Sequence, residues 1–200
     1  GGGSYCSVPG TGVAVGLSGS EIGTNYQLLL DVFTPIGSPM IGNGTPLSFG
    51  LKTAVGRYTV AAIDVFTGCS IYMSGSVNVA ATPATTYYVD SDGDGYGTTL
   101  STIQACSPPI GYVANSSDCN DADTTEHPGQ VWFIDTDEDD YGNGSTALQC
   151  ARPLHGYIPA ELTATTGDCN NSNAFVFPGA PEICNGIDDD CDNYIDEGCG

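Results

Sequence analysis

Basic residues are almost absent from this chain of 200 residues, which has three Lys and Arg residues against 24 Asp and Glu. Proteins that bind nucleic acid displace phosphate counterions with Lys and Arg, so this composition argues against a nucleic-acid partner. The acids are also unevenly placed, because twenty-one of them, with a single base, follow Thr82. Such a density of one charge repels itself unless cations neutralise it.

Long apolar runs and catalytic signatures are missing as well. No run reaches the ~18 apolar residues that a membrane helix needs, so we expect no membrane span. The only histidines are His127 and His155, and neither belongs to a Ser-His-Asp or Cys-His signature. We therefore expect no enzymatic activity. A copper or zinc site is disfavoured too, because it would gather several imidazole or thiolate ligands.

Nine cysteines indicate an oxidised, extracellular protein, and their spacing does not fit a CxxC zinc pattern. The predicted disulfides are Cys6–Cys69, Cys106–Cys119 and Cys150–Cys169. Closing the long first loop could contribute roughly 3–5 kcal/mol in the chain-entropy model. Cys199 is left to pair with Cys184 or Cys191, or with another copy of the chain, and connectivity cannot be deduced from sequence.

Residues 1–82 carry short alternating apolar runs, separated by Gly, Pro, Ser and Asn at intervals of roughly 8–12 residues. The runs lie at Val13–Leu17, Tyr26–Leu30, Tyr58–Ala62, Ile71–Met73 and Val77–Val79. This pattern predicts an all-β sandwich over 1–82. A linker over 83–86, marked by Pro83 and small residues, separates it from an irregular, disulfide-rich region over 87–200.

The second region contains two copies of one unit, 87–130 and 131–180, and a tail, 181–200. Each has carboxylates at every second position, followed by a residue that turns the backbone. Ca²⁺ takes six to eight oxygen ligands from such loops. The predicted ligands of the first site are Asp90, Asp92, Asp94, Tyr96, Asp118, Asn120 and Asp123. Those of the second site are Asp135, Asp137, Asp139, Tyr141, Asp168, Asn170 and Asn173.

The predicted ligands of the third site are Asp188, Asp190, Asp192, Tyr194, Asp196 and Glu197. The loops differ at the turn, where a positive φ suits glycine. Asp140 stands where the first loop has Gly95, which is a worse fit, whereas Asn193 tolerates the left-handed conformation. Magnesium is a weaker alternative to calcium, because it resists dehydration.

Two resemblances to known families accompany these patterns. The segments Gly1–Cys6, Val15–Ser20, Gly56–Val60 and Thr67–Cys69 resemble the immunoglobulin-like repeats of very large surface adhesins from gliding Bacteroidetes. The tail Pro181–Cys199 and the two preceding units resemble metal-binding motif repeats of secreted bacterial surface proteins, similar in logic to thrombospondin type 3 repeats. The second resemblance implies an extracellular calcium-binding array without catalysis.

The resemblances imply a cell-surface or extracellular adhesin or filament module, stiffened by about three calcium ions and by disulfides. Its expected partners are copies of itself or neighbouring modules joined head to tail, and surface glycans. Asp123-Thr124-Thr125 resembles the O-glycosylation motif of Bacteroidetes, which points to Thr124 as an acceptor. The alternatives are a carbohydrate- or ligand-binding accessory module of a secreted enzyme, and a metal scavenger that prefers copper.

Overall fold

The computed structural model describes residues 2–198, and these residues form strands, turns and loops. Residues 2–198 form fourteen strands and one short 3-10 helix, η1 (Pro159–Glu161). The predicted all-β class is therefore confirmed. None of the helices among the described residues could span a membrane. The chain divides into two compact units, the first comprising residues 1–87 and 103–109, and the second comprising residues 88–102 and 110–200.

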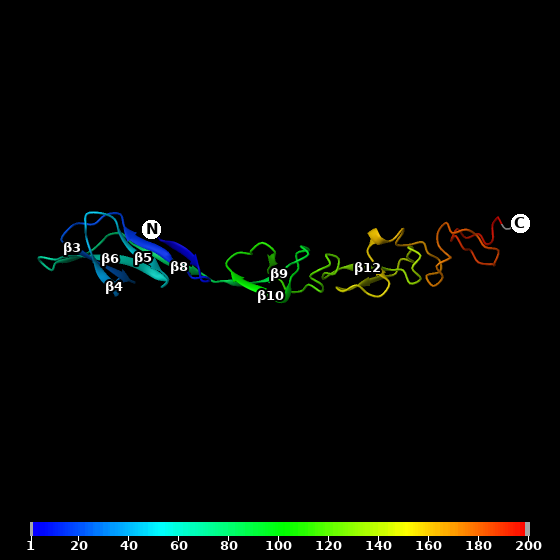
Figure 1. The fold of residues 1–200 in the computed structure, drawn as a ribbon, viewed down its shortest axis with the longest axis horizontal. Helices are drawn as coiled ribbons and strands as arrows, with labels where there is room; N and C mark the ends of the chain where they lie inside the picture. The colour runs from blue at the N-terminus through cyan, green and yellow to red at the C-terminus, as the bar shows by residue number, and fades with distance from the viewer. Residues whose placement is uncertain (1, 199–200) are drawn as a thin grey trace. The chain divides into compact units, whose positions relative to one another are not determined.

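Unit 1 contains a six-stranded sheet and a two-stranded sheet (Figure 1). The larger sheet has the order β1 (Gly3–Cys6), β8 (Val77–Thr82), β6 (Gly56–Asp64), β3 (Thr24–Leu30) and β4 (Thr34–Ile41). Its remaining strand, β7 (Ser70–Tyr72), pairs with β6. The smaller sheet joins β2 (Val13–Leu17) to β5 (Leu47–Lys52).

The core of unit 1 lies between these two sheets. Val15 and Leu47 from the smaller sheet belong to one buried cluster with Leu28, Tyr58 and Val79 from the larger sheet. Burial of such side chains supplies the main favourable term in folding. Unit 1 is therefore built from two sheets that share one core, while the immunoglobulin-like sandwich remains a prediction.

The predicted runs correspond to β2, β3, β6, β7 and β8, whereas β1, β4 and β5 were not anticipated. Strand β4 carries Pro35, Gly37 and Pro39, residues that usually interrupt strands. It lies at the edge of the sheet, where a missing N–H need not remove a ladder hydrogen bond. Its side chains are mostly exposed, so no alternating pattern marks the strand in the sequence.

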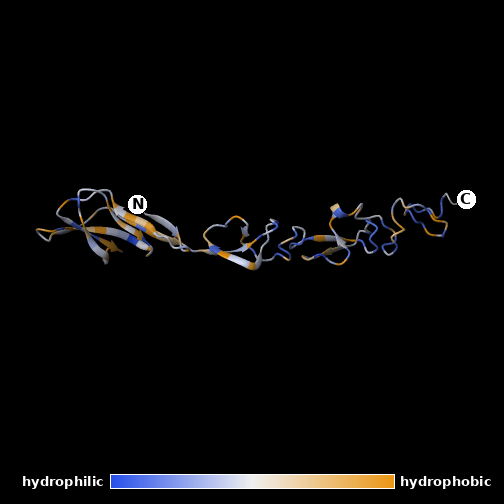
Figure 2. Cartoon of the chain, viewed as in Figure 1, coloured by the Kyte–Doolittle hydropathy of each residue, from blue (hydrophilic) through white to orange (hydrophobic). Residues whose placement is uncertain are grey.

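The repeated units each contain a small three-stranded sheet with one topology. The first has β9 (Thr85–Val89) between β10 (Thr98–Ala105) and β11 (Tyr112–Val113). The second has β12 (Val131–Ile134) between β13 (Thr146–Leu148) and β14 (Gly156–Tyr157). Each central strand leads into an acidic loop, and these loops are largely hydrophilic (Figure 2). Two residues of the predicted linker, Thr85 and Thr86, belong to β9.

The second small sheet is built on Trp132, which is fully buried. Its indole Nε1 donates a 2.9 Å hydrogen bond to the carbonyl of Gln149. The guanidinium of Arg152 lies 4.6 Å from the centre of the Trp132 ring and forms an ion pair with Glu161 at 2.7 Å. This apolar patch with its cation supports the strand that leads into the second loop.

The three predicted disulfide pairings are wrong. The structure has Cys6–Cys106, Cys119–Cys150 and Cys169–Cys191. Cys69 is a free, exposed thiol, and Cys184 is disulfide-bonded. The predicted pairing of Cys199 lies outside the described residues.

Strand direction explains the difference. Cys6 lies level with Thr82 at the end of β8, and β8 runs antiparallel to β6. Cys69 follows the other end of β6, so Cys6 and Cys69 lie at opposite ends of the sheet. Strand β10 likewise carries Cys106 away from the acidic loop and back to Thr82, whose carbonyl lies 3.3 Å from the Cys106 sulfur. Sequence proximity therefore gave the wrong partners.

Candidate metal centres

In each of the three acidic loops, the first aspartate accepts two hydrogen bonds from backbone N–H groups later in the loop. The carboxylate of Asp90 accepts hydrogen bonds from the backbone N–H groups of Gly93 (2.8 Å) and Gly95 (3.2 Å). Asp135 does the same for residues 138 (2.8 Å) and 140 (3.0 Å). Asp188 accepts from residues 192 (3.2 Å) and 193 (2.8 Å). Each first carboxylate therefore curls its loop around itself.

The curl requires a left-handed backbone at the fourth and sixth positions of every loop. Both positions are glycine in the first loop. In the other loops they are Glu138 (φ 65°), Asp140 (φ 71°), Cys191 (φ 63°) and Asn193 (φ 77°). Side chains at these positions are strained relative to glycine, least for Asn and Asp. All three loops nevertheless adopt the same turn.

Alternate carboxylates converge within each loop. One oxygen from each of three residues lies within 4.8 Å of the others in three sets, namely Asp90/Asp92/Asp94, Asp135/Asp137/Asp139 and Asp188/Asp190/Asp192. In the first loop Asp92 and Asp94 each use one oxygen to bind a backbone N–H two residues later. The second oxygen of each is buried and has no hydrogen-bond partner.

A further aspartate from later in the chain, Asp118 or Asp168, lies near each of the first two clusters but outside the convergent sets. The backbone N–H of Asp118 donates to the carbonyl of Gly97 (3.1 Å), and that of Asp168 donates to the carbonyl of Gly142 (3.2 Å). In each aspartate Oδ2 is buried without a partner. Asp168 is only 7% exposed. The structure thus brings the distal aspartates to the loops through backbone hydrogen bonds, not through the local disulfides that the sequence suggested.

Burial and mutual repulsion affect the protonation of these carboxylates. Loss of hydration raises the pKa of Asp92, and the neighbouring charges of Asp94 and Asp118 raise it further. Loss of hydration likewise raises the pKa of Asp139, with Asp137 and Asp168 adding repulsion. A bound cation would reverse both effects, because opposite charge favours the ionised form.

Four predicted ligands of the distal turns accept hydrogen bonds from residues of their own turns. Asp123 accepts hydrogen bonds from the backbone N–H (3.0 Å) and hydroxyl (2.7 Å) of Thr125. The side chain of Asn170 accepts from Ser172 (2.8 Å), and that of Asn173 accepts from the N–H of residue 175 (3.4 Å). The carbonyl of Asn120 accepts from residues 122 and 123. Thr124, the proposed glycosylation acceptor, is exposed in the same turn.

The tyrosine rings of the first two loops stack on aromatic side chains from the distal segments. Tyr96 stacks on His127 with ring centres 5.5 Å apart, and Tyr141 stacks on Phe177 at 5.4 Å. The equivalent Tyr194 of the third loop is 69% exposed. The stacks attach each loop to the segment that follows its distal aspartate, which explains why one unit uses His where the other uses Phe.

Sequence reasoning missed two tethers between the distal turns and the loops. Asp121 accepts hydrogen bonds from the N–H (2.7 Å) and hydroxyl (2.6 Å) of Ser91. At the equivalent place, Asn171 accepts from the N–H of Thr136 (3.1 Å). The shared position of Asp121 and Asn171, two residues after a cysteine in both units, was the available signal.

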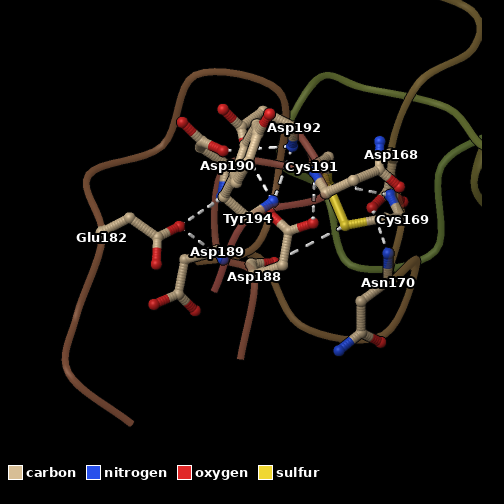
Figure 3. Close-up of a disulfide and its surroundings, with 11 residues drawn as sticks. Asp168, Cys169, Asn170, Glu182, Asp188, Asp189, Asp190, Cys191, Asp192 and Tyr194 are labelled. Carbon is tan, nitrogen blue, oxygen red and sulfur yellow. Dashed lines mark hydrogen bonds between the residues drawn. A yellow bond between two sulfur atoms is a disulfide. The ribbon is translucent and has the colours of Figure 1, made fainter. Parts of the chain in front are cut away.

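The third loop also uses a residue that was not predicted, Glu182. One of its oxygens lies within 4.8 Å of oxygens from Asp190 and Glu197, and Glu182 accepts the backbone N–H groups of residues 189, 190 and 196. The predicted ligand Asp196 instead accepts from the N–H groups of residues 185 and 186. Figure 3 shows Glu182 approaching the loop from the side. Glu182 belongs to no repeat, so spacing could not identify it.

Two parts of the chain match a known family. The family model named Cu-binding MopE, described as "Putative metal-binding motif", matches residues 118–131 and 168–197. The matched residues include both distal aspartates and the third loop. Neither a curated protein nor a solved structure matched the chain. Together, the motif, the convergent carboxylates and the three disulfides fit an extracellular metal-binding module.

Proposed function

We propose that this chain is an extracellular, structural calcium-binding module of a bacterial surface adhesin or filament, with no catalytic role. The observation that carries the proposal is the set of buried carboxylate oxygens without partners, in Asp92, Asp94 and Asp118 around the first loop. The second loop repeats it. Buried charges are costly unless they are paired or coordinate a metal. Two equivalent sets of buried carboxylate oxygens without hydrogen-bond partners are therefore best explained by two bound cations.

The donor chemistry favours calcium. Every converging atom in the first two clusters is a carboxylate oxygen, and hard cations prefer oxygen, whereas copper is favoured by imidazole and thiolate. The name of the matching family mentions copper, but His127 stacks on Tyr96. His155 lies 3.2 Å from Glu138, which is not among the convergent sets.

The proposed mechanism is stabilisation by neutralisation. Ca²⁺ cancels the repulsion between clustered carboxylates, and its binding free energy becomes folding free energy for a region with little apolar core. Calcium and disulfides together stiffen unit 2, which contains the three acidic loops. The resemblance to adhesin repeats supports a place in a stalk or fibre.

Thermal unfolding of the oxidised protein in CaCl₂, MgCl₂, CuCl₂ and EDTA tests the metal. We expect calcium to raise the melting temperature of one transition, with about three ions bound per chain by elemental analysis. Asp137→Asn should lower the bound calcium by one ion, whereas Glu21→Gln, a charge-matched change in unit 1, should not. Equal stability in EDTA and CaCl₂ would refute the proposal, and selective stabilisation by CuCl₂ would replace calcium with copper.

Light scattering tests assembly separately. An adhesin or filament subunit that joins copies head to tail should form particles larger than the monomer in CaCl₂ under oxidising conditions. A protein that remains monomeric at all concentrations would remove self-assembly from the proposal and leave the calcium sites untouched.

A further inference from the structure

Each distal aspartate is followed directly by a cysteine that is bonded to a later part of the chain. Cys119, after Asp118, is bonded to Cys150, and Cys169, after Asp168, is bonded to Cys191. We propose that these disulfides are positioning elements, each of which holds its neighbouring aspartate in a metal site. The inference rests on the proposed metal binding and adds that metal affinity depends on the redox state of a specific disulfide.

The second site shows the arrangement in detail. Asp168 is nearly buried, its Oδ1 accepts the N–H of Asn170 (2.7 Å), and its Oδ2 has no partner. The next residue is fixed twice, because Cys169 forms the disulfide and its N–H lies 3.2 Å from the sulfur of Cys191. Figure 3 shows Asp168 beside this disulfide, with the third loop on the other side of the bond.

The other attachments of Asp168 are individually weak. They include the backbone hydrogen bond to Gly142, the tether from Asn171 to Thr136 (3.1 Å) and the stack of Tyr141 on Phe177. A typical intramolecular hydrogen bond contributes only about 1 kcal/mol net. Without the disulfide, a binding cation would have to order the Asp168 turn itself, and that ordering cost is subtracted from affinity.

The first site has the same construction. Asp118 Oδ1 accepts the N–H of Asn120 (3.0 Å), and Oδ2 is orphaned. Its cysteine, however, is bonded to Cys150, which follows the strand after the second acidic loop. The Cys119–Cys150 bond therefore supports the first site although one of its sulfurs belongs to the second repeat. Removal of the Cys119–Cys150 bond should therefore weaken the first site although Cys150 lies in the second repeat, and this result distinguishes the inference from a local effect of each disulfide on its own repeat.

The test is a titration of the full oxidised chain with CaCl₂. NMR measures the shifts of the backbone amides of Tyr96 in the first loop and Tyr141 in the second, and each shift gives the calcium affinity of its loop. Cys119→Ser/Cys150→Ser should weaken calcium binding at the first loop about tenfold or more, as loss of outer-shell support typically does, and leave the second loop within about twofold. Cys169→Ser/Cys191→Ser should give the reverse result. Cys6→Ser/Cys106→Ser, which removes a disulfide of unit 1 that adjoins neither aspartate in the sequence, is the matched control and should change neither.

A second comparison separates positioning from a general loss of structure. If the Cys169–Cys191 bond acts through Asp168, its removal should cause no further loss of affinity at the second loop in the Asp168→Asn background. Buried Trp132 fluorescence reports folding in each variant, and alanine pairs replace serine pairs if a serine variant unfolds.

The outcomes are distinguishable. Amides that do not shift with CaCl₂ at either loop of the wild type would overturn the proposed function. Loops that bind calcium with unchanged affinity in both disulfide variants, or that weaken together in either variant, would overturn this inference alone.

Discussion

At the scale of single residues, the second loop carries side chains where the first loop has glycine. Glu138 has a φ of 65° and stands at the place of Gly93. A non-glycine residue is disfavoured in this conformation. Relief of the left-handed strain, roughly 1–2 kcal/mol, should exceed the entropic cost of glycine, roughly 0.5–1 kcal/mol. We therefore expect Glu138→Gly to raise the free energy of unfolding of the second repeat in EDTA by up to about 1 kcal/mol, measured by urea denaturation.

The reverse change is the matched control. A Cβ atom at Gly93 would meet no other atom within 4 Å, so Gly93→Glu should lower the free energy of unfolding by a similar amount, mainly through backbone strain. Asp140→Gly should raise the free energy of unfolding less than Glu138→Gly does, because aspartate tolerates the left-handed region better. A loss of stability in Glu138→Gly would mean that the contact with His155 outweighs the strain.

The ion pair beside the buried tryptophan predicts a pH dependence. The hydrogen bonds from Arg152 lower the pKa of Glu161 from its usual value of 4.5. A lowered pKa stabilises the native state above the unfolded value, and this contribution disappears as the pH falls through the lower native value. Both side chains are partly exposed, so the contribution is at most about 1 kcal/mol.

Trp132 fluorescence during urea unfolding measures this contribution of the ion pair to the free energy of unfolding. Glu161→Gln should be less stable than the wild type at neutral pH, and the difference should shrink as the pH falls below the unfolded pKa and vanish below the lowered native pKa of Glu161. Glu21→Gln, in unit 1, should leave the unfolding transition reported by Trp132 unchanged. A difference that persists at acid pH would assign the effect to packing rather than charge.

At the scale of elements, the first two acidic loops are each followed by a glycine, Gly97 or Gly142, that lies close to the end of the central strand. A Cβ atom on Gly97 would lie 2.8 Å from the carbonyl of Val89 and 2.8 Å from the side chain of Val113. Overpacking of this kind typically costs roughly 1–3 kcal/mol. We therefore expect Gly97→Ala to destabilise the first repeat and to weaken calcium binding at its loop, measured by urea denaturation and the Tyr96 amide.

Gly75→Ala is the control for that substitution, because no atom lies within 4 Å of a Cβ built there. It should have little effect. If Gly97→Ala were equally neutral, the strand and loop would not be tightly packed in solution.

Local pattern and repetition explain which elements the sequence could predict. The alternating runs identified β2, β3 and β6, because one face of each strand is buried. Repetition pointed to Asp118 and Asp168, which the structure indeed brings to the loops. The edge strand β4 and the residue Glu182 lacked both signals. Disulfide partners depend on the direction in which strands carry the chain, and spacing does not contain that information.

At the scale of the whole molecule, the two units differ in charge. Twenty-one acids and one base follow Thr82, whereas three acids and two bases precede Pro83. Between about 0.01 M and about 1 M salt the screening length falls from about 30 Å to about 3 Å. In EDTA, NaCl should therefore raise the melting temperature of the acidic unit and change that of unit 1 much less.

Differential scanning calorimetry separates the two transitions. Saturating CaCl₂ should largely remove the salt dependence, because bound cations already cancel the repulsion. Equal salt responses of both transitions in EDTA would show that charge repulsion does not limit the stability of the acidic unit.

The order of the three described disulfides determines which residues would carry tension if the chain were pulled from its ends. Covalent bonds shield the segments between Cys6 and Cys106, between Cys119 and Cys150, and between Cys169 and Cys191. Force therefore runs through the intervening stretches 106–119 and 150–169. Each of these stretches ends next to an aspartate that faces a metal site, Asp118 or Asp168. If calcium binds as proposed, tension along the backbone would act first on its coordination, and ion binding would set the force at which the chain begins to lengthen.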